Sequence, residues 1–586
     1  MTAGSDSNFQ DFFVAYQRGA FLAVEVGCRR MACRSPADGR VIHLLSLALF
    51  QLGRHGEAER WLRRGGLLTT GADLVDVRVN LASALLAQGR HEEALASSAA
   101  ALDLDPGKAR ALSTRADILR ADLRSVQALG AGRQAAALEP GRDETWTTIG
   151  NALQAAGRIP EALGAYARAM ALSPNSIIAH GNRQFTLCFA ETTDDEALYQ
   201  AARTSGRILE AAFPPVPMPR PIRRGRLRIG YHSFEFFARS ALDDYFPPVL
   251  ESHDRRRFEI VLIGDGGRQD RRTDELQTCA DRWVDVAGLD LAAKVERLRG
   301  LDLDIAVCLT GYLPVQRLVF APRIAPVQVA LMNHVSTTGM KAFDFRVTDR
   351  WLDPPGATER WNVEKLVRLA HGYVPMRPPA GAPGGTPLPA RANGYVTFGS
   401  FNNLSKITPG TLALWSRVLA ALPTSRLLLK ARALEDAKVT TRYLDLATRA
   451  GIEPRRIDIM GSVPDNHAHL SALARADIAL DPVPFSGGRT TVETLAMGVP
   501  VVNLRSPMIM GRLGDSLLSR AGLGHLVAAS ADRFVETAVA LASDLDALER
   551  MRRDLPAMLL RSQLCDVAGY TRELEDAFEA MVDGRL

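Results

Sequence analysis

A loop rich in glycine and hydroxyl residues lies in the last fifth of the chain. Gly487 and Gly488 are adjacent, and the residues after them favour the start of a helix. Adjacent glycines let a backbone approach a phosphate closely, and the free N–H groups at a helix start attract an anion. Thr490 and Thr491 add hydroxyl donors, and Glu493, one turn further on, could accept hydrogen bonds from a ribose. The segment predicts a site for phosphate and ribose, although an ordinary helix-opening turn also fits the glycine pair.

A lysine in an earlier segment could neutralise a diphosphate. Lys406 belongs to the stretch 401–409, which follows an apolar run and precedes a predicted helix. The chain has 71 basic residues but only seven lysines, which makes each lysine worth separate consideration. A solvated surface lysine is the alternative interpretation.

Two histidines, His467 and His469, lie between these segments, near the start of a predicted helix. An imidazole there could stack on a base or form a hydrogen bond with it. Solvated side chains are the alternative. No carboxylate or cysteine cluster accompanies the pair, so we predict no metal site and no bound cofactor.

Short apolar runs must position these segments. They alternate with helical stretches over two blocks of roughly 150 residues, a pattern typical of doubly wound α/β lobes. Ligands of such sheets bind beyond the carboxyl ends of the strands, which places the site in a cleft between two lobes. The runs are 227–231, 258–263, 303–309 and 327–331 in the first block and 395–398, 426–429, 457–459, 477–480 and 501–504 in the second.

The first third of the chain carries an internal repeat. Pro106, Pro140 and Pro174 are 34 residues apart, and matching Gly-Arg phrases begin at Gly53 and Gly157. This is the tetratricopeptide period, in which glycine turns the chain between two helices and each helix pair buries its face against its neighbours. We therefore predict an α solenoid of about five repeats, with a concave groove for a peptide. A scaffold that only orients the next domain, or that forms a dimer, is the alternative.

Composition excludes several classes of protein. Apolar residues make up 47% of the 586 and charged residues 23%, which argues against disorder. The net charge of +5 makes no case for nucleic-acid binding. No apolar run reaches membrane-spanning length, and the N-terminus lacks the plan of a signal peptide. Six cysteines form no C-x-x-C pair, so we expect reduced thiols and a cytoplasmic location.

Together, these motifs resemble the O-linked N-acetylglucosamine transferase family, which also includes the SPINDLY-type fucosyltransferases. That family joins tetratricopeptide repeats to two Rossmann-like lobes in the GT-B arrangement. The resemblance implies four parts. They are a repeat superhelix (1–180), a helical and Pro-rich linker (181–226), an N-terminal lobe on the acceptor side (227–390) and a C-terminal lobe that binds the nucleotide sugar and ends in closing helices (391–586).

The resemblance also implies an activity: inverting transfer of a sugar, N-acetylglucosamine from UDP-GlcNAc, to Ser or Thr of a protein recognised by the repeats. Lys406 and the helix end would stabilise charge on the leaving diphosphate without a metal. The matched positions are Lys406 at the diphosphate, Asn403 in place of a family glutamine, His469 beside the uracil, Gly488, Arg489 and Thr490 in the phosphate loop, and Glu493 at the ribose.

Several positions depart from the family pattern. Arg239 stands where the family commonly has a histidine near the acceptor, and Arg489 stands at a usual threonine. By alignment His232 and His334 lie near the same cleft, where either could orient an acceptor or act as a base, or could simply be packed or solvated.

These departures leave alternatives open. Arg239 and Arg489 would suit an acidic sugar, as in a flagellin glycosyltransferase with a CMP-nonulosonic acid donor. A non-catalytic repeat adaptor is a further alternative, against which Lys406, the phosphate loop and Glu493 argue. The acceptor, for which flagellin is one candidate, and a homodimer stay open.

Overall fold

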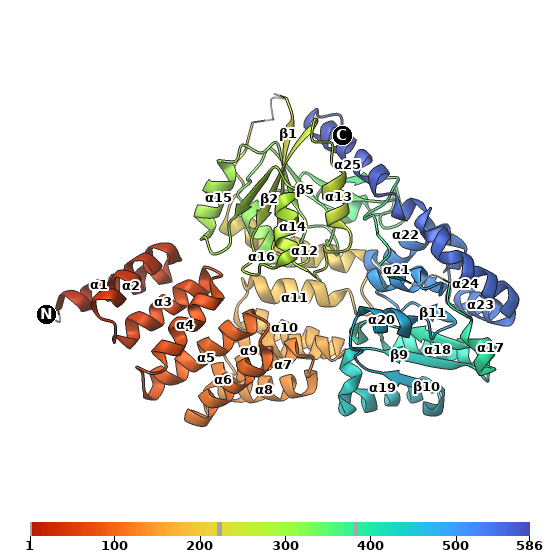
Figure 1. Cartoon of the computed structure of the whole chain (residues 1–586), viewed down its shortest axis with the longest axis horizontal. Helices are drawn as coiled ribbons and strands as arrows, with labels where there is room; N and C mark the ends of the chain where they lie inside the picture. The colour runs from red at the N-terminus through yellow and green to blue at the C-terminus, as the bar shows by residue number, and fades with distance from the viewer. Residues whose placement is uncertain (1–2, 220–224, 239, 380, 383–384) are drawn as a thin grey trace.

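The computed structural model describes the chain except residues 1–2, 220–224, 239, 380 and 383–384. A curved array of helix pairs leads into two α/β lobes that stand side by side (Figure 1). The helices of the array are α1 (Ala3–Gln17), α2 (Phe21–Arg34), α3 (Gly39–Gln51), α4 (His55–Gly65), α5 (Gly71–Ala87), α6 (His91–Leu104), α7 (Ala109–Ala121), α8 (Ser125–Leu138), α9 (Asp143–Ala155), α10 (Ile159–Leu172), α11 (Ile177–Leu187) and α12 (Asp195–Ala212).

Small residues allow the two helices of a repeat to approach closely. A Cβ at Gly150 would lie 2.5 Å from the ring of Tyr166, and Ala162 and Ala169 are fully buried. The chain turns from α9 into α10 at Gly157, where a φ of 68° favours glycine. The predicted repeat array is confirmed.

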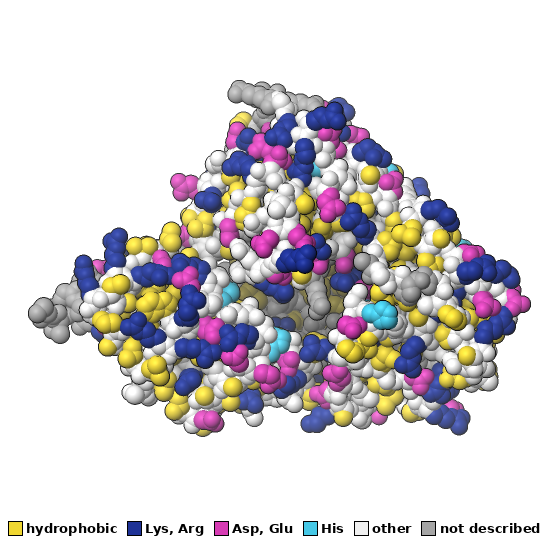
Figure 2. All heavy atoms as spheres, viewed as in Figure 1, with side chains coloured by type: hydrophobic (Ala, Val, Ile, Leu, Met, Phe, Trp, Pro, Cys, Tyr) yellow, Lys and Arg dark blue, Asp and Glu magenta, His cyan; other side chains and the backbone are white. Residues whose placement is uncertain are grey.

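Ion pairs link successive repeats. At three of the turns, the arginine that follows the turn reaches an acidic residue of the preceding repeat, so part of the arginine excess has a structural role. On the face shown in Figure 2, basic and acidic side chains are interspersed over the repeats. The pairs are Arg54–Glu25 at 3.2 Å, Arg90–Glu59 at 2.7 Å and Arg124–Glu92 at 2.6 Å.

The first lobe is built on a parallel seven-stranded sheet in the order β3-β2-β1-β4-β5-β6-β7. Sequence analysis predicted four of these strands and missed β3, β6 and β7, which have four residues each. The strands are β1 (Leu227–Ser233), β2 (Phe258–Gly264), β3 (Arg282–Asp285), β4 (Ile305–Cys308), β5 (Val327–Ala330), β6 (Phe345–Thr348) and β7 (Lys365–Arg368). The helices are α13 (Phe246–Ser252), α14 (Arg271–Thr278), α15 (Leu291–Arg299), α16 (Pro314–Arg317), η1 (Leu318–Phe320) and η2 (Glu359–Trp361).

The second lobe has a parallel six-stranded sheet in the order β10-β9-β8-β11-β12-β13. Its strands are β8 (Thr397–Ser400), β9 (Arg426–Lys430), β10 (Ile457–Met460), β11 (Ile478–Leu480), β12 (Val501–Leu504) and β13 (Val527–Ala528). Its helices are α17 (Pro389–Asn393), η3 (Leu404–Lys406), α18 (Pro409–Ala421), η4 (Arg432–Glu435), α19 (Ala437–Arg449), η5 (Pro454–Arg456), α20 (Asn466–Leu473), α21 (Arg489–Ala496), η6 (Ile509–Gly511), α22 (Leu513–Arg520), η7 (Gly524–Leu526), α23 (Ala531–Ser543), α24 (Leu545–Leu560), η8 (Gln563–Cys565) and α25 (Val567–Val582).

The last helix returns to the first lobe. Helix α25 packs against α13 (Figure 1), and the Nδ1 atom of His253 lies 2.9 Å from Glu575 Oε1. The chain therefore crosses between the lobes twice, which ties them together. The fold class predicted from the sequence is confirmed.

The repeats contact both lobes through the turns between their helices. The turn at Gly53 lies against the first lobe, where its Cβ would come 3.2 Å from the Cα of Gly267. The turn at Gly157 lies against the second lobe, where its Cβ would come 2.3 Å from the hydroxyl of Tyr443. That hydroxyl donates to the carbonyl of Leu404 over 2.6 Å. The repeats thus support the turn η3 that carries Lys406.

Candidate active site

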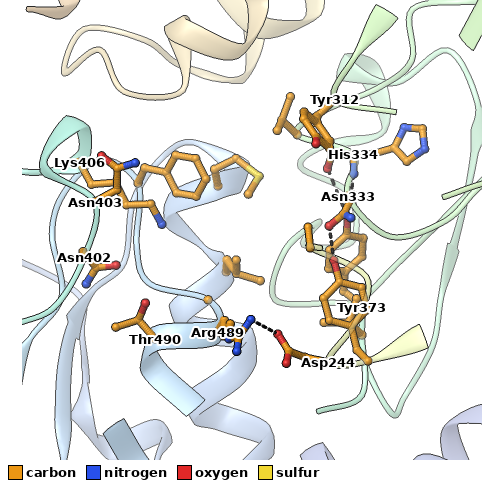
Figure 3. Close-up of a pocket in the computed structure, with 18 of the residues that line it drawn as sticks. Asp244, Tyr312, Asn333, His334, Tyr373, Asn402, Asn403, Lys406, Arg489 and Thr490 are labelled. Atoms are coloured by element: carbon orange, nitrogen blue, oxygen red, sulfur yellow. Dashed lines mark hydrogen bonds and ion pairs between the residues drawn. The ribbon is translucent and has the colours of Figure 1, made fainter. Parts of the chain in front are cut away.

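A cavity of about 550 Å³ lies between the two lobes, at the carboxyl ends of their strands. Both lobes line it (Figure 3). Of the site residues predicted from the sequence, six line this cavity: His334, Asn403, Lys406, Gly488, Arg489 and Thr490.

Lys406 joins two segments that are distant in the sequence. It lies on η3, which begins with the Asn403 side chain accepting a hydrogen bond from Ser405 N over 3.0 Å. The Lys406 ammonium donates to the carbonyl oxygen of Ser486 over 2.7 Å and lies 3.9 Å from the centre of the Phe485 ring. Burial lowers the pKa of Lys406 to about 8, against the opposing attraction of a buried carboxylate. The lysine is therefore fixed at the phosphate loop and still largely charged at neutral pH.

The buried carboxylate is Asp481, which holds the phosphate loop in shape. It accepts hydrogen bonds from Gly487 N over 3.2 Å and from Asn503 Nδ2 over 3.1 Å. Burial raises its pKa to about 6, while these donors and Lys406 pull it down. A Cβ on Gly487 would come 2.1 Å from the hydroxyl of Thr491. Gly487 and Thr491 therefore shape the turn and do not line the cavity, whereas Gly488 does.

Charged side chains form a chain behind the start of α21. The two oxygens of Glu493 contact Arg489 Nε at 2.8 Å and His469 Nε2 at 3.2 Å. The Nδ1 atom of His469 lies 2.8 Å from the ammonium of Lys430. Burial opposes ionisation of Glu493, but its partners hold the pKa of this carboxyl below the usual value. His469 and Glu493 lie behind the cavity wall and fix the position of Arg489.

Arg489 also reaches across the cavity to the first lobe. Its NH1 atom lies 2.9 Å from Asp244 Oδ2 (Figure 3). Burial raises the pKa of Asp244 to about 6, and the nearby guanidinium lowers it. Sequence analysis missed Asp244, because its separation of 245 residues from Arg489 gives no local signal.

Apart from Asp244, the wall from the first lobe is neutral and largely aromatic. The Tyr312 hydroxyl donates to Glu235 Oε1 over 2.8 Å, and Asn333 Nδ2 donates to Glu235 Oε2 over 3.4 Å. The Tyr245 hydroxyl donates to the side-chain oxygen of Asn333, and Tyr373 completes this wall. Burial raises the pKa of Glu235. No role was predicted from the sequence for any of these residues.

The two candidate histidines of the first lobe are both packed in its interior. The Nε2 atom of His334 lies 3.1 Å from the carbonyl oxygen of Cys308, and burial lowers the pKa of this imidazole to about 3. Its ring points away from the second lobe (Figure 3). His232 is fully buried, lies 3.2 Å from Asp265 Oδ2 and does not line the cavity. Arg239 lies outside the described residues.

Among the residues that the structure describes, no group of three or more His, Cys, Asp and Glu side chains has an arrangement that could hold a metal ion. Within the same residues, none of the helices combines the length and apolar character that crossing a membrane requires.

A repeat array joined to two parallel α/β lobes, with a charged cavity between the lobes, defines a two-lobed glycosyltransferase. The sequence model of glycosyl transferase family 41 matches residues 211–375 and 387–574, and a tetratricopeptide repeat model matches residues 75–108. The chain therefore belongs to glycosyl transferase family 41, and the predicted resemblance is confirmed.

Its relatives fit this membership. A protein of Solanum lycopersicum, named probable UDP-N-acetylglucosamine–peptide N-acetylglucosaminyltransferase SPINDLY, is 36% identical over 407 residues, which are 68% of this chain and 44% of that protein. The SPINDLY protein of Arabidopsis thaliana is 37% identical over 360 residues, 61% of this chain and 39% of that protein. The chain thus spans less than half the length of these relatives. The solved structure of a mutant Thermobaculum terrenum O-GlcNAc transferase has a TM-score of 0.82 and 33% identity, and the match covers 88% of this chain and 98% of that one.

Proposed function

We propose that the protein is an inverting transferase that moves N-acetylglucosamine from UDP-GlcNAc to a Ser or Thr hydroxyl of a protein acceptor. One observation carries this proposal: the Lys406 ammonium is held 2.7 Å from the phosphate loop, beside the start of α21, in a cavity between two lobes. Departure of a nucleoside diphosphate places negative charge where a fixed ammonium and the free N–H groups of a helix can stabilise it.

The predicted site residues of the second lobe each have a role in this proposal. Lys406, Gly488 and Thr490 hold the diphosphate, and Asn403 lies beside it. The proposal keeps Glu493 for the ribose hydroxyls and His469 for the base on the family resemblance alone, because neither residue lines the cavity. These ligands supply the stabilising charge themselves, so the reaction is proposed to need no metal and no bound cofactor.

The first lobe and the repeats receive the acceptor. The wall of tyrosine and asparagine side chains offers hydroxyl and amide groups that can orient a sugar and an incoming hydroxyl. An imidazole with a pKa of about 3 is a weak base at neutral pH. The proposal therefore assigns the proton transfer to neither His334 nor His232. The acceptor is a protein held by the repeats; flagellin and a homodimeric assembly stay open.

The charges of the cavity favour a neutral sugar over a nonulosonic acid. Arg489 is paired with both Asp244 and Glu493, so two carboxylates already balance the positive charge that a sugar carboxylate would need. A non-catalytic adaptor is less favoured, because a buried ammonium in an unused cavity would cost stability without a return in function.

Nucleotide binding tests the proposal. We would measure heat of binding and thermal stabilisation for UDP, GDP and CMP and their sugars, with the wild type and Lys406→Ala. UDP and UDP-GlcNAc should stabilise the wild type and lose that effect in the variant. Stabilisation by CMP compounds alone would support the acidic donor, and by GDP compounds alone a fucose-type donor. No response to any nucleotide would support the adaptor.

A further inference from the structure

We propose that Asp244 and Arg489 act together as a filter that admits donors with an uncharged sugar and rejects donors whose sugar carries a carboxylate. The inference rests on the proposed function, since it concerns the sugar of the nucleotide donor. It assigns a specificity-determining role to Asp244, a residue of the first lobe that faces the phosphate loop of the second.

Arg489 lies between two carboxylates. Its Nε atom lies 2.8 Å from Glu493 Oε1, and its NH1 atom lies 2.9 Å from Asp244 Oδ2. Two carboxylates on different lobes therefore share one guanidinium. Glu493 is 7% exposed and fixed from behind by His469, so it holds the guanidinium in place while Asp244 covers the side that faces the first lobe.

Asp244 faces the cavity from the first lobe. Its side chain is 27% exposed and lines the cavity opposite Lys406 (Figure 3). In the proposed binding mode the diphosphate lies at Lys406 and at the start of α21. The sugar attached to it then extends toward the first lobe, where Asp244 lies beside the neutral wall of Tyr245, Tyr312 and Asn333.

The charges decide which sugar fits. Within the part of the chain that the structure describes, the cationic side chains lining the cavity are Lys406 and Arg489. A diphosphate engages the first, and two carboxylates already engage the second. A sugar carboxylate would add an anion next to Asp244 without a cation to receive it, and like charges a few ångströms apart repel strongly in a partly buried site. Sugar hydroxyls can instead donate to the Asp244 carboxylate.

The experiment compares two donors that differ only at C6 of the sugar, a neutral CH2OH group against a carboxylate. We would measure the dissociation constants of UDP, UDP-GlcNAc and UDP-N-acetylglucosaminuronic acid by calorimetry for the wild type, Asp244→Asn and Arg489→Thr. The wild type should bind the acidic donor about tenfold more weakly than UDP-GlcNAc. In Asp244→Asn this ratio should fall toward one, because the repulsion is removed and the guanidinium gains a free side. In Arg489→Thr the ratio should rise at alkaline pH, where Asp244 stays ionised although the guanidinium that lowers its pKa is gone.

Controls separate the filter from other effects. Asp243→Asn changes the neighbouring acid, which pairs with Arg272 at 2.6 Å and does not line the cavity, and it should leave the ratio unchanged. The same ratio is measured in Arg239→Ala, because Arg239 precedes the cavity residue Ser240 in the chain. Opposite changes in Asp244→Asn and Arg489→Thr would not arise from a general loss of structure.

The outcomes are distinct. A ratio near one in the wild type, or a ratio that Asp244→Asn leaves unchanged while UDP still binds, overturns the filter and leaves the proposed function standing. A ratio that depends on Arg239 and not on Asp244 also overturns it. Failure of the wild type to bind any of UDP, GDP and CMP overturns the proposed function itself, and the filter with it.

Discussion

The two walls of the cavity are built on different principles. The second lobe presents fixed charges, with Lys406 and Arg489 beside the start of a helix. Apart from Asp244, which pairs with Arg489, the first lobe presents neutral hydroxyl and amide groups, such as Tyr312 and Asn333, arranged around the buried acid Glu235. Anchoring an anion needs charges that do not reorganise, whereas orienting a sugar needs directional hydrogen bonds. The contrast predicts that changes in the second wall affect binding of the nucleotide and changes in the first affect turnover.

The largest effect is expected at Lys406. Lys406→Ala should lower kcat by about 10²- to 10³-fold, because a preorganised charge at the leaving group is lost, and should weaken UDP binding. Lys365→Ala, at an exposed lysine on the edge strand β7, should leave both unchanged. A Lys406→Ala variant with the kcat of the wild type would contradict a role of the charged wall in stabilising the leaving diphosphate.

The first wall is tested by Tyr312→Phe. Loss of the hydroxyl leaves Glu235 with one donor fewer, so we expect a loss of about 1–3 kcal/mol in the free energy of unfolding. We also expect kcat to fall about tenfold while the dissociation constant of UDP changes less than about twofold. Tyr199→Phe is the control, since Tyr199 packs on Trp361 away from the cavity. Weaker UDP binding in Tyr312→Phe would erase the contrast between the walls.

The sequence predicted the wall of the second lobe better than the wall of the first lobe. The predicted residues of the second wall lie in two short segments, 401–409 and 485–493, so their types and spacing could be recognised together. The first wall gathers residues from loops that are distant in the chain, of types common on any surface. His232 shows a further limit: strands of a parallel sheet are buried on both faces, so the pattern around β1 does not tell which side chains reach the cavity.

The fold was predicted where a signal repeats. The 34-residue period identified the helical array, and apolar runs identified β10 and every central strand except β6, which has only four residues. The strands β3, β7 and β13 lie at the sheet edges, and β3 and β7 carry charged residues such as Arg282 and Lys365. Since edge strands are short and half-solvated, burial does not impose an apolar pattern on them.

Two glycines of the repeats give a matched pair of variants that tests whether the repeats support the charged wall. Gly157→Ala and Gly53→Ala introduce a side chain at nearly the same φ, 68° and 67°, so both should lose about 1 kcal/mol in the free energy of unfolding. Only Gly157→Ala presses on Tyr443, which supports the turn that carries Lys406. We expect it to raise the dissociation constant of UDP about threefold, and Gly53→Ala to leave that constant unchanged. Equal effects of both variants would contradict a specific link from the repeats to the charged wall.

The smallest effect concerns pH and belongs to the charged wall alone. The pKa of Lys406 is lowered to about 8 by burial, and a lysine is charged below its pKa. Donor affinity should therefore be full well below this value and decline as the pH approaches and passes it, by about twofold between pH 7 and pH 8. In Lys406→Arg the guanidinium stays charged, so the affinity should be lower throughout but without this decline. Calorimetric titrations with UDP over this range check both curves. No group of the first wall that contacts the diphosphate in the proposed binding mode titrates between pH 7 and pH 8. Tyr312→Phe should therefore keep the pH profile of the wild type. A changed profile in that variant would show that the two walls are coupled.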